Sequence, residues 1–311
     1  MGEVKRSCGL WGALSAVLVL APFGAGCGGS KGGAGAEDAA DPIAVAERAL
    51  AEGDARRALS LVSGADPDPA RANALLTLKA RALIALTQWD EVESLAARIG
   101  DAAGKALVVC ELKAARRDIG AVKACGDAIA ACEAAGQSVW ADQARVAQAA
   151  GFEADRRYGE AERILKALVA TRPTARARRV LVDYYARTGL VPDAVAALEA
   201  WRAAEPGAKG LDLKLALLVE RQVKGDLLER RGVEALAAAR RLRELQPARA
   251  EFRYYLADAL ELTGDAKGAA AERAAAEAAG AKPPRKATDV PGLDMPATPP
   301  TAPATAPETR P

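Results

Sequence analysis

Histidine is absent from the 311-residue chain, and this absence limits the chemistry that the protein can perform. Without an imidazole the chain cannot build a Ser-His-Asp or Cys-His catalytic centre or the common zinc enzymes. No glycine-rich phosphate-binding loop follows a strand pattern, and acidic residues such as Glu160 and Glu162 belong to solvated helix faces. We therefore expect a protein that is not an enzyme and that holds no cofactor and no metal.

Aromatic residues and net charge are also scarce. Phe, Trp and Tyr make up 4% of the chain, which argues against an aromatic-lined pocket for a small ligand. The 43 basic and 41 acidic side chains nearly cancel, so the chain lacks the basic stripe that nucleic-acid binding needs. The composition favours proteins or peptides as partners and excludes nucleic acid.

Helix-forming sequence, by contrast, is abundant. Ala, Leu, Arg, Glu and Lys dominate residues 43–280, and apolar residues recur at helical spacing, as in Leu165, Leu168 and Val169. Glycine and proline mark the expected helix ends, at Gly53-Asp54, Thr171-Arg172-Pro173, Thr188-Gly189, Glu205-Pro206-Gly207 and Thr263-Gly264-Asp265. No convincing strand alternation is present in the sequence. The sequence predicts an all-α fold.

A helical hairpin recurs along the chain. The segment 180–189, Val-Leu-Val-Asp-Tyr-Tyr-Ala-Arg-Thr-Gly, is matched by 255–264, Tyr-Leu-Ala-Asp-Ala-Leu-Glu-Leu-Thr-Gly. A small residue recurs about every 34 residues, where the second helix should cross the first most closely. These residues are Ala58, Val92, Ala128, Ala161, Ala194, Ala235 and Ala269. One hairpin cannot bury its own apolar face, so neighbouring hairpins must stack into a solenoid.

Helix pairs of this period, with a small residue at the crossing and a proline after the second helix, resemble the tetratricopeptide repeat family. The best copy spans about residues 175–206. It matches the family signature at Leu181, Val182, Tyr185, Gly189, Ala194, Leu198 and Pro206. The copy that closes on Pro173 and the last copy, which includes Ala276, come next.

Other copies follow the family pattern less closely. The stretch 105–137 keeps the hairpin but loses most signature residues, and the copy that ends at Pro247 has a long first helix over residues 211–230. The resemblance implies an α-solenoid of about six to seven stacked hairpins over residues 43–280. It also implies that partners bind in a concave groove lined by the first helices.

The first 26 residues have the order of a bacterial export signal. Lys5 and Arg6 precede an apolar stretch over residues 10–23, and a Gly-Ala-Gly run then leads to Cys27. This order resembles the lipobox of bacterial lipoproteins, which implies removal of residues 1–26 and lipidation of Cys27. A plain secretory signal and an uncleaved anchor are the alternatives. The anchor is disfavoured because the stretch is shorter than the ~20 residues that span a bilayer.

The lipoprotein resemblance also implies a location. Gly28 follows the cysteine with no aspartate nearby, which in that family favours the bacterial outer membrane, with the protein facing the periplasm. Secretion to the periplasm is the alternative. Residues 27–42 are predicted to be a Gly/Ala-rich tether and residues 281–311 a disordered Pro/Ala/Thr-rich tail, because neither segment can bury a core.

Three further cysteines fall on one predicted hairpin. Cys110 lies on its first helix and Cys125 and Cys132 on its second, with a turn near residues 118–120. Antiparallel pairing about residue 119 places Cys110 midway between the other two, so a disulfide to either is consistent with an oxidising periplasm. The other interpretation is that all three are small buried apolar residues. Three thiolates at these spacings do not make the usual four-ligand metal site.

The groove positions of the best copy fall on one helical stripe, formed by Arg176, Arg179, Asp183 and Arg187. One interpretation is a docking strip for an acidic peptide or a peptide carboxylate, because arginine binds carboxylates through two hydrogen bonds. The other is a solvent face in which Asp183 pairs with Arg179 and Arg187 at i, i+4 spacing. In the last copy the matching positions are Glu251 and Tyr254.

Two functions are compatible with these features. The first is a lipid-anchored periplasmic scaffold that binds envelope proteins or peptides through its concave surface and assists assembly of an envelope complex. The second is a small-ligand-binding or envelope-sensing accessory module without catalytic activity. A bound peptide or protein would favour the first, and an apolar ligand cavity would favour the second.

Overall fold

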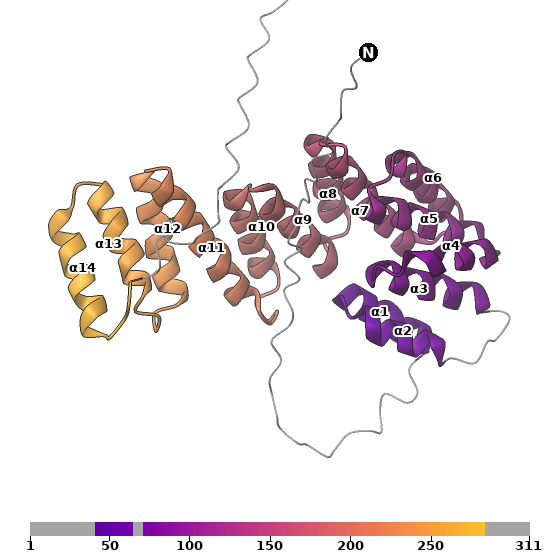
Figure 1. The fold of residues 1–311 in the computed structure, drawn as a ribbon, viewed down its shortest axis with the longest axis horizontal. Coiled ribbons are helices and arrows are strands. Elements are labelled where there is room, and N and C mark those ends of the chain that lie inside the picture. The colour runs from indigo at the N-terminus through magenta and orange to yellow at the C-terminus, as the bar shows by residue number, and fades with distance from the viewer. Residues whose placement is uncertain (1–40, 65–70, 284–311) are drawn as a thin grey trace, which may run out of the picture. The chain divides into compact units, whose positions relative to one another are not determined.

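The computed structural model describes residues 41–64 and 71–283, and all the regular structure in these residues is helical. In chain order the fourteen helices are α1 (Pro42–Glu52), α2 (Ala55–Ser63), α3 (Ala72–Ala85), α4 (Trp89–Arg98), α5 (Ala102–Arg116), α6 (Ala121–Ala134), α7 (Ser138–Ala154), α8 (Tyr158–Thr171), α9 (Ala175–Thr188), α10 (Val191–Ala204), α11 (Leu211–Leu228), α12 (Gly232–Leu245), α13 (Phe252–Leu262) and α14 (Ala266–Ala278). They pair into seven consecutive hairpins (Figure 1). The prediction of an all-α solenoid is confirmed.

Each helix packs against its neighbours in the chain. Contacts join the two helices of every hairpin and also the second helix of one hairpin to the first helix of the next. The first helices α1, α3, α5 and α7 also contact one another in order, as do α11 and α13. The buried apolar residues form four clusters that follow one another along the chain. The core is therefore a series of local interfaces, as in other stacked repeats.

The small residues predicted at the helix crossings are buried in all seven hairpins. Ala58, Val92, Ala128, Ala161, Ala194 and Ala235 have no exposed surface, and Ala269 is 1% exposed. In every hairpin except the third, this residue is the fourth of the second helix. A small side chain at that place lets the two helix backbones approach closely, which explains why the position repeats.

The turn inside six of the hairpins has a residue in the left-handed conformation five positions before the small residue. Glycine fills this position in three of them, at Gly53, Gly189 and Gly264, as the turn signals predicted. In the others the residues are Thr87, Arg156 and Arg230, with φ near 60°. The backbone of the turn is therefore repeated even where its glycine is missing.

The third hairpin, α5 and α6, departs from this pattern. Arg117 and Gly120 both have positive φ, so its turn is longer than in the other hairpins. The Cα atoms of Cys110 and Cys125 lie 4.6 Å apart. Pairing is therefore centred between Arg117 and Asp118, and the prediction that Cys110 lies midway between Cys125 and Cys132 is wrong by about one helical turn.

The predicted boundaries lie close to the observed ones. The first helix begins at Pro42 and the last ends at Ala278, and the long first helix of the sixth hairpin ends at Leu228, two residues before its predicted end. Residues 1–26, the lipidation site Cys27, nearly all of the tether and the tail from residue 284 lie outside the described residues. Among the helices of the described segments, none has the length and hydropathy needed to cross a membrane.

Candidate functional site

The four predicted groove residues all lie on α9 but have different surroundings. Arg187 binds Glu153 of α7 through two hydrogen bonds of 2.8 and 2.7 Å, which raise the pKa of its guanidinium. Asp183 accepts a hydrogen bond of 2.6 Å from Nζ of Lys214 on α11. The predicted ion pairs of Asp183 with Arg179 and Arg187 do not form, because first helices of the adjacent hairpins supply better-placed partners.

Arg176 and Arg179 lie nearer the N-terminal end of α9, where they meet α1. Nη1 of Arg179 lies 3.4 Å from the carbonyl oxygen of Ala51, at the end of α1. Arg176 is half-buried and, within the described part of the chain, makes no hydrogen bond or ion pair. Burial, together with the positive charge of Arg81, lowers the pKa of the Arg176 guanidinium. The α9 stripe thus has two parts. Arg176 and Arg179 lie near α1, whereas Asp183 and Arg187 are neutralised by ion pairs.

The two groove positions predicted on the last repeat do not form a free surface. Tyr254 is buried, and its hydroxyl donates to the carbonyl oxygen of Ala281 at 3.1 Å, so its assignment to the groove is wrong. Glu251 precedes α13 and forms an ion pair with Arg249 at 2.6 Å. Tyr254 is turned inward, with its hydroxyl at the chain just beyond α14, whereas Glu251 is only partly buried.

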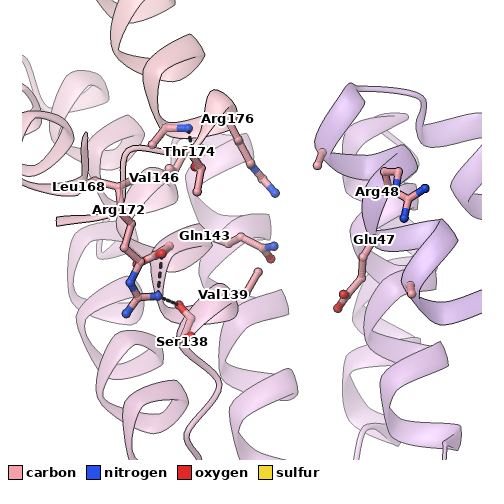
Figure 2. Close-up of a pocket in the computed structure, with 14 residues that line it drawn as sticks. Glu47, Arg48, Ser138, Val139, Gln143, Val146, Leu168, Arg172, Thr174 and Arg176 are labelled. Atoms are coloured by element: carbon pink, nitrogen blue, oxygen red, sulfur yellow. Dashed lines mark hydrogen bonds and ion pairs between the residues drawn. The ribbon is translucent and has the colours of Figure 1, made fainter. Parts of the chain in front are cut away.

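A cavity of about 490 Å³ lies between α1 on one side and α7, α8 and α9 on the other. Figure 2 shows Glu47 and Arg48 of α1 facing Val139, Gln143 and Arg176 across this space. Nε1 of Trp140 on α7 approaches Oε1 of Glu47 at 3.4 Å. Together with the contact between Arg179 and Ala51, this hydrogen bond holds α1 opposite the later helices.

The wall of the cavity combines apolar surface with buried polar groups. A second cavity of about 280 Å³ shares Gln143, Val146 and Arg176 with the first and is also lined by Arg81 and Glu111. Arg81 is 5% exposed and donates from Nε to Oε2 of Glu111 at 2.9 Å. Gln143 is 6% exposed. Nη1 of Arg81 and Oε1 of Gln143 have no hydrogen-bond partner in the described part of the chain.

Not every charged residue at the cavity is available. Arg172 donates from Nη1 to Oδ2 of Asp142 and to the carbonyl oxygen of Ser138, both at 2.8 Å (Figure 2). Asp142 also accepts from Arg145 at 2.9 Å. Arg145 is also paired with Glu133, so these four charges neutralise one another. The charges at the cavity that have no ion-pair partner among the described residues are those of Arg176 and, on α1, of Glu47 and Arg48.

The three cysteines lie in one buried cluster of the third hairpin. Cys110 and Cys125 are joined in a disulfide, and Cys132 is a free, fully buried thiol. Burial raises the pKa of Cys132, so the thiol stays protonated and unreactive. Of the pairings left open by the sequence, the structure contains the one between Cys110 and Cys125.

The sequence patterns did not identify Glu47, Arg81 or Gln143 as site residues. A signal was present for Arg81, which interrupts the apolar run of residues 80–84 in the middle of a helix that is otherwise buried there. A charged residue at such a place needs a partner or a ligand. No comparable signal marks Glu47, because its position on the cavity depends on where α1 lies relative to α7.

Comparisons with known proteins do not place the chain in a family. No protein-family model matches it, and no curated protein is significantly similar to it. The structure shows the stacked helical hairpins, whereas membership of the tetratricopeptide repeat family stays a prediction.

Proposed function

We propose that the protein is a non-catalytic scaffold of the tetratricopeptide type that binds an envelope protein and assists assembly of an envelope complex. A lipid on Cys27 holds it at the bacterial outer membrane, facing the periplasm. The fold supports this function because seven helical hairpins stack in series along the chain. Such repeats generally present surfaces to partners.

The observation that carries the proposal is an exposed apolar pair on the first helix of the sixth hairpin. Leu213 and Leu217 of α11 are 61% and 48% exposed, one helical turn apart. Around the helix axis, the two leucines lie between Glu220 and Arg221. Glu220 accepts a hydrogen bond from Tyr255 of α13, and Arg221 donates one to the carbonyl oxygen of Ala186 on α9. They therefore lie on the side of α11 that faces neither neighbouring first helix.

Exposed leucines at this place fit a partner segment that has apolar side chains. Arg221, which is exposed and forms no ion pair within the described residues, flanks the pair and favours an acidic residue beside those apolar side chains, whereas the nearby Lys224 is already paired with Glu220. Capture of an envelope protein through this face of α11 would allow the protein to act as the proposed scaffold.

The anchor is tested by replacing Cys27 with serine. Serine cannot carry the thioether-linked lipid, so we expect Cys27→Ser to move the protein from the membrane fraction to the soluble periplasmic fraction. Quantitative immunoblotting of the two fractions measures the change, and Cys132→Ala, which removes a buried thiol, serves as the control that stays in the membrane. Continued sedimentation of Cys27→Ser with membranes would exclude the lipid anchor.

The docking face is tested by crosslinking in native envelopes, followed by affinity capture and mass spectrometry. We expect Leu217→Glu to lose the envelope protein captured by the wild-type chain, because a carboxylate replaces apolar contact area. The matched control is Val233→Glu on α12, whose side chain is 74% exposed but lies on a second helix. Equal capture by Leu217→Glu and Val233→Glu, or no capture by the lipidated wild-type chain, would refute the proposal.

A further inference from the structure

The two exposed leucines of α11 belong to a longer stripe on that helix. The stripe consists of four residues at spacings of four, three and four, which places them on one side of α11: Leu213, Leu217, Glu220 and Lys224. Nζ of Lys224 pairs with Oε1 of Glu220 at 2.7 Å. The stripe therefore has an exposed apolar half and an ion-paired half.

The chain that follows the last helix leaves the described structure beside the ion-paired half. The carbonyl oxygen of Ala281 accepts the hydrogen bond from Tyr254, which holds the chain beyond α14 against α13. Ala281 and Lys282 line a pocket of about 500 Å³ together with Glu220 and Lys224 of α11. The last described residue is Pro283, so residues 284–311 continue from the edge of this pocket.

The sequence of this tail gathers its apolar and acidic side chains in one short segment. Among residues 284–311, the aliphatic side chains larger than alanine, proline aside, are Val290, Leu293 and Met295. Two of the three acidic residues of the tail, Asp289 and Asp294, lie in the same stretch. Residues 289–295, Asp-Val-Pro-Gly-Leu-Asp-Met, are called the tail segment below. The tail segment has the composition that suits the exposed leucines and Arg221, namely apolar side chains with an acidic residue beside them.

The connection is long enough to bring the tail segment to the leucines. Asp289 follows Lys282 by seven residues, and seven residues of extended chain span up to about 23 Å at ~3.3 Å each. Along α11, Leu213 precedes Glu220 by seven residues, which corresponds to ~10.5 Å at about 1.5 Å per residue. The tail segment can therefore run from the pocket back along α11 and lie over both leucines.

We infer that the tail segment of this same chain folds back onto the face of α11 formed by Leu213, Leu217 and Arg221, and that it covers this face until an envelope protein displaces it. The apolar side chains of the tail segment pack against Leu213 and Leu217. Asp294 pairs with Arg221, whose guanidinium donates to the carbonyl oxygen of Ala186 but has no ion-pair partner within the described residues. Arginine forms strong charge-assisted hydrogen bonds with carboxylates.

The tether favours the chain's own tail over an unattached peptide. Two exposed leucines and one arginine offer a small contact area, so a free peptide of this sequence binds weakly. A short flexible connection raises the effective concentration of the tail segment to the millimolar range. A segment with a dissociation constant of about 1 mM then covers the face roughly half of the time. Docking of the tail does not depend on the scaffold function, whereas its competition with an envelope protein rests on that proposed function.

Met295 provides the first test, because it is the only methionine after residue 1. In the full mature chain labelled with [methyl-13C]methionine, we expect the NMR signal of Met295 to be shifted and broadened relative to that of a synthetic peptide of residues 287–297. Leu217→Glu should return the signal to the position in the peptide, whereas the control Val233→Glu should leave it as in the wild-type chain. A wild-type signal at the position in the peptide, unchanged by Leu217→Glu, would overturn the inference.

Photo-methionine at position 295 identifies what the tail segment contacts. We expect irradiation to join Met295 to residues 211–228 of the same chain, in a product with the mass of one chain. The yield should fall at least threefold in Arg221→Glu and recover in the double variant Arg221→Glu/Asp294→Arg, because the reversed pair restores the attraction. Crosslinks formed only between two chains, with a yield that rises with protein concentration, would assign the face to a second copy and refute docking within one chain.

The capture experiment in native envelopes tests the competition. Leu293→Glu places a charge in the tail segment, so we expect it to uncover the face and to raise capture of the envelope protein at least threefold over the wild-type chain. Thr305→Glu, in the same tail but outside the tail segment, is the matched control and should capture like the wild-type chain. Capture by Leu293→Glu no higher than that of the wild-type chain would show that the tail does not compete for this face. Absence of capture in every variant, with the Met295 shift and crosslink intact, would instead contradict the scaffold proposal and leave the docking of the tail supported.

Discussion

Replacing Ala194 with glutamate should destabilise the protein by roughly 3–5 kcal/mol, enough to unfold the fifth hairpin. Ala194 has no exposed surface and lies in the same buried cluster as Leu181 and Leu198. A carboxylate there would be both too large for the crossing of α9 and α10 and without a cationic partner. Urea denaturation followed by circular dichroism measures the loss.

The matched control lies two residues further along the same helix. Ala196 is exposed on α10, so Ala196→Glu introduces the same charged side chain, with the same helix propensity, outside the crossing of α9 and α10. We expect this variant to change the free energy of unfolding by less than about 0.5 kcal/mol. Similar denaturation midpoints for Ala194→Glu and Ala196→Glu would mean that the repeat register derived from the small residues is wrong.

Loss of the disulfide is expected to cost about 3 kcal/mol. The bridge closes a loop with a sequence separation of 15 residues, and restricting such a loop in the unfolded chain stabilises the native state by roughly that amount. The double variant Cys110→Ala/Cys125→Ala should therefore unfold at lower urea than the wild-type chain. Adding dithiothreitol should lower the midpoint of the wild-type chain and leave that of the double variant unchanged.

Cys132→Ala is the control for this experiment. The residue is equally buried but takes no part in the bridge, so the variant should keep its sensitivity to dithiothreitol. Alkylation of the unreduced, denatured wild-type chain should modify only Cys132 among the three cysteines of the hairpin. Modification of Cys110 or Cys125 in that experiment would show that the protein folds without the bridge.

The solenoid could be predicted because its determinants repeat. A small residue such as Ala161 or Ala235 must be present at each crossing, and a glycine such as Gly189 favours the left-handed turn five positions earlier. These requirements are local, so they leave a periodic trace in the sequence. The third hairpin was predicted less well, because the longer turn at Arg117 and Gly120 shifts the pairing of its helices by one turn.

The site was predicted less completely because its contacts are not local. Asp183 and Arg187 were expected to pair along α9, yet Lys214 and Glu153 lie about one repeat away in sequence and reach them from neighbouring helices. The spacing of charges within a helix cannot reveal such partners. The cavity itself depends on the approach of α1 to α7 and α9, over sequence separations of about three and four repeats respectively.

The disulfide of the third hairpin also sets a mechanical limit. In a protein tethered at its N-terminus and bound to a partner further along the chain, tension would act through each hairpin in series. The segment between Cys110 and Cys125 cannot lengthen, which withholds about 50 Å of chain at ~3.4 Å per residue. The third hairpin, which has lost most of the repeat signature, is thereby the hairpin that would release the least chain length when stretched.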